Sequence, residues 1–531
     1  MFRVPQNLIV LAVVVLLLFL NPQAVAAQED ISEYGAYAEV NGIEMYYEVQ
    51  GEGEPLLLIH GAMGSTEDFA AVIPAFLDAG YQTIAFDCRG RGRSTDSGVM
   101  LSYAVMAEDT IALMDELGIE TASIAGQSDG AMIGLHLAIH YPDRIDKLIS
   151  YGANFNVGGL LPANIEWLES LTQADMEAMF GADYRKIAPD PDHLPVLFEQ
   201  LRHMFLTQPN FTVYDLMGIE AEVLVFDGED EDTVRIDHAR QMAAAIPNSS
   251  MVILPGTGHH LMYEDPETYL EYAIPFLAGE LDASPDGRYA AVNNIAMYYE
   301  IHGEGEPVLL MPSGMWSTAD FADLTERLAQ EFQVIVVDAR GRGQSTDSGE
   351  RLDFTLMADD VEAFMDALSL EAVHLVGWAD SAVVGLDVAM RYPKRVDKLV
   401  AYAPNYTVDG LAEDHRAWLK SLSLDDMFSF FGEAYARTAP DPSYLPAMSE
   451  RIRAMFLTEP NYTLAQLATI RSPVLILDGE NDEFILREHL EEMAEAMPTA
   501  ELAWLPDLGH YAPFDDPEIW TSAVLDFLNE P

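Results

Sequence analysis

Basic residues are scarce in this sequence. Its 531 residues contain 27 lysines and arginines against 88 aspartates and glutamates, and the formal net charge at pH 7 is −61. Nucleic acids and anionic membranes bind to basic surfaces, so this composition argues against both as partners. Only five residues are lysine. An acidic, lysine-poor surface suits a salty medium, in which counterions screen the repulsion between carboxylates, so we expect tolerance of high salt.

Cysteine is nearly absent as well, because Cys88 is the only one in the chain. No intramolecular disulfide can therefore form. The sequence also has no cysteine cluster and no histidine-rich spacing of the kind that binds zinc. We predict neither a metal nor another cofactor.

The N-terminus has the pattern of an export signal. An uninterrupted apolar run, Leu8–Leu20, follows Arg3 and precedes a small-x-small cleavage signal at Ala24–Ala26. The run is shorter than the roughly 20 apolar residues that span a bilayer. We predict that residues 1–27 are a cleaved signal peptide and that the protein is periplasmic or extracellular. The alternative is a membrane anchor formed by the uncleaved segment.

The chain repeats itself at a fixed interval. Arg89–Gly98 (RGRGRSTDSG) recurs almost unchanged as Arg340–Gly349 (RGRGQSTDSG). A period of about 250 residues is the size of a whole domain rather than of a solenoid unit. Half of the residues are apolar, which is enough for sizeable cores. We predict two domains, residues 28–280 and 287–531, joined by a short linker.

Short apolar runs alternate with helical stretches in each half. In the first half the runs typical of buried parallel strands are 55–59, 83–86, 122–125, 147–150 and 223–226. This alternation predicts an α/β fold, a mostly parallel sheet with helices on both faces. Two long helical stretches, about 154–218 and about 405–470, interrupt it. We interpret them as lids over the carboxyl ends of the strands, where α/β proteins place their sites.

A candidate nucleophile stands in Gly126–Gly130 (GQSDG), after a predicted strand and before a predicted helix. The pattern G-x-S-x-G places its serine, here Ser128, on a sharp strand-to-helix turn. Serine is a weak nucleophile until a base takes its proton. His259 follows the last predicted strand of the domain, which is the place of the base in the chain order serine, acid, histidine. We predict Ser128 as nucleophile and His259 as base.

The base needs a carboxylate to fix its tautomer and to stabilise the imidazolium. The stretch Asp227–Asp232 (DGEDED) offers five candidates. Gap-free alignment of the two halves pairs Glu231 with Asp482, three residues after a glycine, where such folds usually place the acid. We therefore predict Glu231, with Asp232 as the alternative.

Acyl transfer also needs preorganised N–H donors for the oxyanion. One should be the backbone N–H of Asp129, directly after the nucleophile. The other should come from the loop after the first parallel strand, His60–Met63, and we assign it to Ala62. His60 itself we expect to be structural.

These motifs together resemble the α/β-hydrolase superfamily of esterases, haloperoxidase-like and epoxide-hydrolase-like enzymes. The resemblance covers both halves and rests on His60-Gly61, on Asp87–Ser94, on the Ser128 turn and on Gly258-His259. It implies an α/β-hydrolase fold for each half. Epoxide hydrolases and dehalogenases carry an aspartate as nucleophile, so Ser128 argues against both.

Within that superfamily the sequence Ser-Asp-Gly, followed by Tyr151–Asn154 (YGAN), is similar to the biphenyl-hydrolase-like branch that includes valacyclovir hydrolase. In that branch the acidic residue after the serine helps to receive a substrate amine. The resemblance therefore implies a substrate-binding role for the side chain of Asp129.

The second half departs from the pattern at its nucleophile. Its turn reads Gly377–Ser381 (GWADS), so Ala379 stands at the position of Ser128, although Asp482 and His510 are kept. Without a hydroxyl at the tip of the turn no acyl-enzyme can form. We predict a catalytically silent duplicate that stabilises the first half or binds a ligand without chemistry.

The leading functional prediction is hydrolysis of a small carboxylic ester or thioester through an acyl-enzyme in the first domain. The same triad also suits a lactonase, an amidase, a C–C hydrolase or a perhydrolase. A third possibility, from another class, is an exported binding protein whose triad is vestigial. In each case the ligand is a small molecule, and no stable membrane partner is expected after signal cleavage.

Overall fold

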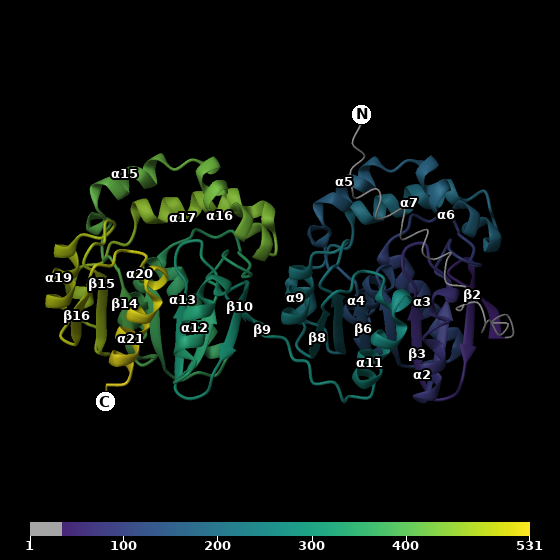
Figure 1. Ribbon diagram of the computed structural model, residues 1–531, viewed down its shortest axis with the longest axis horizontal. Helices are drawn as coiled ribbons and strands as arrows, with labels where there is room; N and C mark the ends of the chain where they lie inside the picture. The colour runs from purple at the N-terminus through teal and green to yellow at the C-terminus, as the bar shows by residue number, and fades with distance from the viewer. Residues whose placement is uncertain (1–33, 531) are drawn as a thin grey trace.

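Two eight-stranded sheets, one in each half of the chain, organise the computed structural model, which describes residues 34–530 (Figure 1). They confirm the predicted fold class of two tandem α/β domains. The predicted signal peptide lies outside the described residues. None of the helices formed by residues 34–530 has the length and apolar character that a bilayer crossing requires.

The first sheet has the strand order β1-β2-β4-β3-β5-β6-β7-β8. Its strands are β1 (Gly35–Val40), β2 (Ile43–Gln50), β3 (Glu54–Ile59), β4 (Tyr81–Phe86), β5 (Ala122–Gln127), β6 (Ile145–Tyr151), β7 (Glu222–Gly228) and β8 (Ser249–Leu254). The six strands β4, β3, β5, β6, β7 and β8 are parallel, whereas β2 pairs antiparallel with both β4 and the edge strand β1. Each of the five predicted apolar runs lies inside one of the parallel strands. Burial on both faces explains their continuous apolar character.

Helices cover both faces of this sheet. On one face α3 (Tyr103–Leu117), α4 (Asp129–His140) and α9 (Ile236–Ala245) share a buried apolar cluster with Leu57 and Ile59 of β3. On the other face α2 (Ile73–Asp78) and α11 (Pro266–Leu277) share a second cluster with Leu56 and Leu58. The alternation of neighbouring leucines between two cores is the period-two geometry of a strand. The short α10 (Leu261–Glu264) precedes α11.

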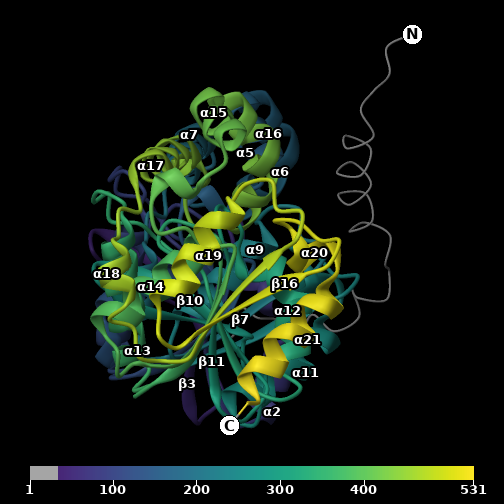
Figure 2. The same ribbon diagram turned by 90° about the vertical axis from the view of Figure 1, so that its left-hand side faces the viewer.

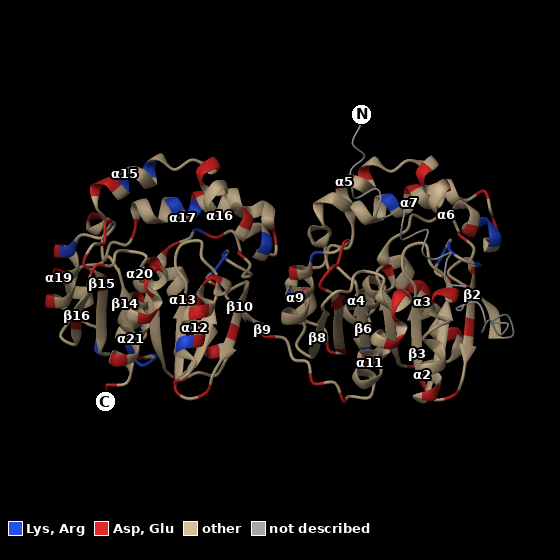
Figure 3. Cartoon of the chain, in the orientation of Figure 1, with Lys and Arg blue, Asp and Glu red and all other residues tan. Residues whose placement is uncertain are grey.

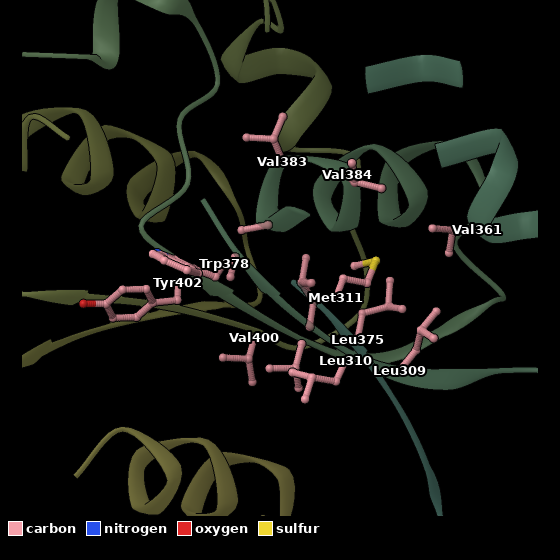
Figure 4. Packing of buried hydrophobic residues seen from close by; sticks show 14 of the residues in the cluster. Leu309, Leu310, Met311, Val361, Leu375, Trp378, Val383, Val384, Val400 and Tyr402 are labelled. Carbon is pink, nitrogen blue, oxygen red and sulfur yellow. The ribbon is translucent and has the colours of Figure 1, made fainter. Parts of the chain in front are cut away.

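The second sheet repeats the first with the order β9-β10-β12-β11-β13-β14-β15-β16. Its strands are β9 (Gly287–Val292), β10 (Ile295–His302), β11 (Pro307–Met311), β12 (Gln333–Val337), β13 (Val373–Trp378), β14 (Val396–Tyr402), β15 (Val474–Gly479) and β16 (Ala500–Leu505). Its flanking helices are α12 (Ala322–Leu328), α13 (Phe354–Ala367), α14 (Asp380–Arg391), α19 (Arg487–Ala496), α20 (Ala512–Asp515) and α21 (Pro517–Leu528). Figure 4 shows part of its core, in which Leu309 and Leu375 of the strands lie below Val383 and Val384 of α14.

Four helices lie between β6 and β7, within the stretch that the sequence marks as a lid. They are α5 (Pro162–Ser170), α6 (Gln173–Ile187), α7 (Leu194–Thr207) and α8 (Val213–Met217). Met63, in the loop after β3, packs on the apolar cluster of these helices, so they cover the carboxyl end of the sheet. The second domain has α15 (Glu413–Ser421), α16 (Leu424–Thr438), α17 (Leu445–Thr458) and α18 (Leu464–Leu467) in the same place. Figure 2 shows α5 and α6 at the same end of the molecule as α15 and α16.

Acidic residues are spread along both domains and both sets of lid helices, with few basic ones between them (Figure 3). The charge of the chain is thus not confined to one face or one tail. A uniformly acidic surface is the distribution that the salt-tolerance prediction assumes.

Candidate active site

The turn that carries Ser128 joins β5 to α4 and is strained. Ser128 has φ 53° and ψ −115°, a conformation that residues other than glycine rarely adopt. A Cβ atom on Gly130 would lie 1.8 Å from the carbonyl oxygen of Ile59, and one on Gly126 would lie 2.6 Å from the backbone of Gly130. In the first domain a side chain at either position would displace the neighbouring backbone, so glycine is favoured at both.

The three predicted triad residues form one hydrogen-bonded chain. Nε2 of His259 lies 3.1 Å from Oγ of Ser128, and its Nδ1 lies 2.9 and 3.0 Å from the two carboxylate oxygens of Glu231. Ser128 follows β5, Glu231 follows β7 and His259 follows β8, so the sheet brings together residues far apart in sequence. Asp232, the alternative acid, is exposed, and its carboxylate accepts a hydrogen bond from Thr233 instead.

The surroundings keep Glu231 ionised. Burial alone would raise the pKa of Glu231, but the hydrogen bond and charge of His259, aided by the N–H of Thr233, lower it to about 2. The N–H groups of Thr233 and Val234 donate to Oε1 of Glu231 over 2.7 and 3.1 Å. Burial and the neighbouring Glu231 carboxylate raise the pKa of Asp227 well above its usual value. One of the two adjacent carboxyl groups is therefore charged and the other protonated.

Glu231 in turn acts on the base. Burial lowers the pKa of His259, but the hydrogen bond and charge of Glu231 outweigh burial, and the pKa is raised above its usual value of 6.5. Glu231 accepts a hydrogen bond at Nδ1, which leaves Nε2 of the neutral ring free to receive the proton of Ser128. The arrangement is that of a serine nucleophile with an oriented general base.

The loop after β3 passes directly beside the nucleophile. A Cβ atom on Gly61 would lie 2.3 Å from Oε1 of Gln127 and 3.5 Å from Cβ of Ser128. His60 fixes this loop, because its Nδ1–H donates to the carbonyl of Gly61 over 2.6 Å and its Nε2 accepts from the N–H of Cys88 over 2.9 Å. Burial lowers the pKa of His60 to about 3, so the ring is neutral and structural, as expected.

The two predicted oxyanion donors belong to the two segments that adjoin the nucleophile. Ala62 belongs to the loop beside Ser128, and Asp129 is the first residue of α4. Within residues 34–530 the N–H groups of Ala62 and Asp129 donate to no backbone carbonyl. Both are therefore free to meet a developing negative charge. The same residues contain no group of three or more histidine, cysteine, aspartate or glutamate side chains placed to hold a metal ion.

The structure contradicts the predicted substrate-binding role of the Asp129 side chain. That side chain is 1% exposed, and its two oxygens accept hydrogen bonds from the hydroxyl of Tyr103 at 2.9 Å and from Nη2 of Arg91 at 3.1 Å. Burial raises the pKa of Asp129, and the charge of Arg91 opposes that rise. A carboxylate already paired inside the protein is not available to a substrate amine. The sequence feature that could have indicated this ion pair is the RGRGR motif, which contains Arg91.

The second domain keeps the turn and the dyad but not the nucleophile. Ala379 has φ 49° and ψ −113°, within a few degrees of Ser128, and Nδ1 of His510 lies 2.7 Å from Asp482. Ser381 cannot replace the missing hydroxyl, because it is 1% exposed and its Oγ donates to the carbonyl of Pro312 over 2.5 Å. Within residues 34–530 no side chain of this turn is hydrogen-bonded to His510, whose side-chain partner is Asp482.

Aromatic side chains pack around the dyad of His510 and Asp482. Trp378 stands in the place of Gln127, and its ring centroid lies 5.7 Å from that of His510 and 5.3 Å from that of Phe514. Trp316, in the place of Gly64, lies 5.1 Å from Phe514. Figure 4 shows Trp378 at the end of its strand, near Tyr402. Polar or small residues of the first site are thus replaced by a packed aromatic cluster.

One oxyanion donor of the second domain is already occupied. Oδ1 of Asp380, the counterpart of Asp129, accepts from the N–H of Gly314 at 2.8 Å and from Oγ of Ser313 at 2.7 Å. Gly314 is the counterpart of Ala62. Phe354 stands where the first domain has Tyr103, so the hydroxyl that holds Asp129 has no equivalent. Sequence reasoning missed this contact, because it depends on the direction in which one buried carboxylate points.

Family models match both halves of the chain. Residues 301–523 match a model described as the alpha/beta hydrolase family, and residues 54–181 match one described as the alpha/beta hydrolase fold. These matches bear out the resemblance noted from the motifs.

Individual relatives are hydrolases of single-domain length. The chain is 28% identical over 262 residues to the putative carbamate hydrolase RutD of Agrobacterium fabrum, covering 44% of this chain and 98% of that one. It is 30% identical over 257 residues to the 2-hydroxy-6-oxononadienedioate/2-hydroxy-6-oxononatrienedioate hydrolase of Comamonas testosteroni, covering 43% and 89%. It is 28% identical over 264 residues to the human serine hydrolase BPHL, covering 48% and 89%.

Proposed function

The chain belongs to the α/β-hydrolase family, and we propose that its first domain is a serine hydrolase that cleaves a small carboxylic ester or thioester through an acyl-enzyme. The observation that carries the proposal is the hydrogen-bonded chain from Oγ of Ser128 through His259 to Glu231. A strained turn, an oriented base and two N–H groups without a carbonyl partner in the segments that adjoin Ser128 are the groups that acyl transfer requires.

Acylation uses each of these groups once. Oγ of Ser128 attacks the carbonyl carbon while Nε2 of His259 takes its proton, and Glu231 stabilises the resulting imidazolium. The N–H groups of Ala62 and Asp129 donate to the oxyanion. The imidazolium then gives its proton to the leaving alcohol or thiol as the carbon–oxygen or carbon–sulfur bond breaks.

Deacylation repeats the sequence with water. His259 takes a proton from the water as its oxygen attacks the acyl carbon, and then returns that proton to Oγ of Ser128 as the acid leaves. The low pKa of Glu231 means that this residue remains a carboxylate throughout. The cycle consumes one ester and one water and regenerates the enzyme.

A second candidate keeps the triad and changes the bond that is cleaved. Two of the similar proteins are named as hydrolases of a carbamate and of oxononadienedioate or oxononatrienedioate compounds. These names favour carbamates and carbon–carbon bonds over the remaining alternatives, lactones, amides and perhydrolysis. Nothing in the triad geometry separates these bonds, since all of them proceed through attack on a carbonyl carbon.

Two further features belong to the proposal. The second domain is catalytically silent, because Ala379 offers no hydroxyl and Gly314 already donates to Asp380. Residues 1–27 direct export, on the sequence pattern given above. The acidic composition is compatible with an exported protein in a salty medium.

Labelling with a fluorophosphonate probe tests the proposal. We expect one label per chain, on Ser128, together with hydrolysis of short-chain p-nitrophenyl esters. Ser128→Ala should abolish both, whereas Ser381→Ala, the matched change at the second turn, should leave both intact. A folded protein that takes up no label would instead be a binding protein with a vestigial triad. A label on the second domain would overturn the assignment of silence.

A further inference from the structure

Arg235 connects the loop of Glu231 to the second domain. It stands four residues after Glu231, directly before α9, and its Nη2 donates to the backbone carbonyls of Ala436 at 2.5 Å and Arg437 at 3.0 Å. Both carbonyls belong to the last turn of α16, a lid helix of the second domain. The last carbonyls of a helix have no partner within the helix and carry partial negative charge, so a guanidinium is a suitable cap for them.

A second side chain reaches the same helix end. Nε2 of Gln241, within α9, donates to the carbonyl of Thr438 over 2.6 Å. Apolar packing continues the contact, because Tyr289 and Tyr298 of β9 and β10 belong to the same buried cluster as Met242 of α9. Figure 1 shows α9 and β9 next to each other between the two domains. The segment from Arg235 through α9, which follows the loop of Glu231, therefore contacts the second domain at several points along its length.

The loop itself is short and is fixed at both ends. The carboxylate of Glu231 accepts hydrogen bonds from the N–H groups of Thr233 and Val234, while the backbone N–H of Arg235 donates to the carbonyl of Gly159 over 2.7 Å. Leu161 donates its N–H to the carbonyl of Thr233 over 3.0 Å. A movement at Arg235 would therefore be passed to Glu231 through two peptide N–H groups that hold its carboxylate.

The second domain shows what the fold alone requires at this position. Its loop repeats the same bonds: Asp482 accepts the N–H groups of Phe484 and Ile485, and the N–H of Leu486 donates to the carbonyl of Gly410 over 2.9 Å. The counterpart of Arg235 is thus Leu486, which has no side-chain donor. An α/β domain of this chain builds the loop without an arginine. The arginine adds the contact between domains through Nη2, while its Nη1 donates to the carbonyl of Gly158 in the first domain over 3.2 Å.

We infer that the second domain fixes the loop of the first domain that runs from Glu231 to Arg235. Arg235 is the positioning residue, because its contact with the second domain restrains the loop and thereby the position of Glu231. The silent domain then has a function: it completes the active site of its neighbour from outside. This inference rests on the proposed function, since it needs Glu231 to orient His259. It assigns no chemistry to the second domain.

Substitution by the residue of the repeat tests it, in the full chain. In Arg235→Leu we expect kcat/KM per phosphonate-titrated site to fall on the order of tenfold, because displacement of a catalytic group by about 1 Å costs up to about 10²-fold. Arg235→Lys keeps the charge and should recover part of the loss. Gln241→Leu removes the hydrogen bond to the carbonyl of Thr438 and should lower kcat/KM by a smaller factor. Arg240→Leu is the matched control, since this exposed arginine of α9 pairs only with Asp237.

The pH profile separates positioning from simple loss of charge. The charged groups that act on His259 are Glu231, Asp232 and Asp129. If Glu231 moves away, the pKa of His259 falls, and the acid limb of kcat/KM shifts to lower pH. Loss of a distant positive charge alone would shift it the other way.

The outcomes are distinguishable. An unchanged rate per titrated site in Arg235→Leu and Gln241→Leu overturns the inference, and so does a loss confined to the number of titratable sites. Failure of the parent protein to take up the phosphonate overturns the proposed function instead. A fall in rate per site with a downward shift of the acid limb, partly rescued by lysine, supports the coupling.

Discussion

A nucleophile can be built into the second site, but the resulting enzyme should be poor. The variant combines Ser128→Ala with Ala379→Ser in the full chain, so that any new activity arises from the second domain. Because the backbone angles at Ala379 match those at Ser128 within a few degrees, the new hydroxyl points toward His510 as Ser128 points toward His259. The hydrogen bond of 2.7 Å between His510 and Asp482 supplies an oriented base.

The expected deficit follows from the oxyanion donors. The N–H of Gly314 donates to Asp380 over 2.8 Å and is not available to a substrate oxyanion. Loss of one such donor costs roughly 10²–10³ in kcat, or about 2.7–4 kcal/mol. Removal of Asp380 is not a clean way to free the donor. Its other oxygen lies 2.9 Å from the fully buried Arg342, and an unpaired buried charge costs about 3–5 kcal/mol of stability.

Phosphonate labelling and ester turnover measure the result, with Ser128→Ala alone as the background. We expect slow labelling and a kcat roughly 10²–10³ below that of the parent. Adding Ser313→Gly removes one of the two bonds that hold Asp380 against the loop and should raise the labelling rate. Parent-like activity would refute the assignment of an occupied donor. No labelling in a folded variant would show that the aromatic cluster around Trp378 has closed the site.

Four other outcomes are expected. Glu231→Gln should lower kcat by up to about 10⁴-fold, because the base loses its orienting anion, whereas Asp232→Asn should stay close to the parent in the same ester assay; the reverse order would show that the acid is misassigned. The acid limb of kcat/KM should lie above pH 6.5, since the base acts only when deprotonated and the pKa of His259 is raised, and a pH–rate series on Glu231→Gln should find it lower. Asp129→Asn should cost about 3–5 kcal/mol in urea unfolding, since Arg91 then lacks its buried counter-charge. The melting temperature should rise from low to molar NaCl, and a steady fall would contradict the screening argument.

The strongest sequence predictions concern residues whose positions are fixed by local sterics. In the first domain Gly126 and Gly130 leave no room for a side chain beside the turn at Ser128, so the G-x-S-x-G pattern identifies this turn from the sequence alone. The choice of Glu231 over Asp232 had a different basis. The second copy of the domain acted as an aligned relative and pointed to the residue that the structure places against His259.

The Asp129 side chain marks where sequence reasoning failed. Its position next to the nucleophile suggested contact with substrate, but its direction is set by Tyr103 and Arg91, which lie 26 and 38 residues away in the chain. A side chain's neighbours in sequence say little about such long-range partners. The antiparallel pair β1 and β2 was also not predicted, because edge strands that face solvent lack the continuous apolar runs that identified the central ones.

Retention of His510 and Asp482 does not imply retained catalysis. Asp482 is 2% exposed at its side chain and accepts the N–H groups of Phe484 and Ile485, so its loss would leave two donors without partners in the loop that leads to α19. His510 in turn covers the buried carboxylate. The dyad of His510 and Asp482 therefore contributes to the stability of the domain even though the site has no nucleophile. The hydroxyl of Ser128 stabilises no loop in this way, since within residues 34–530 its Oγ is hydrogen-bonded to His259 alone. Of the three triad positions, the nucleophile is therefore the one whose side chain can be lost at the least cost to stability.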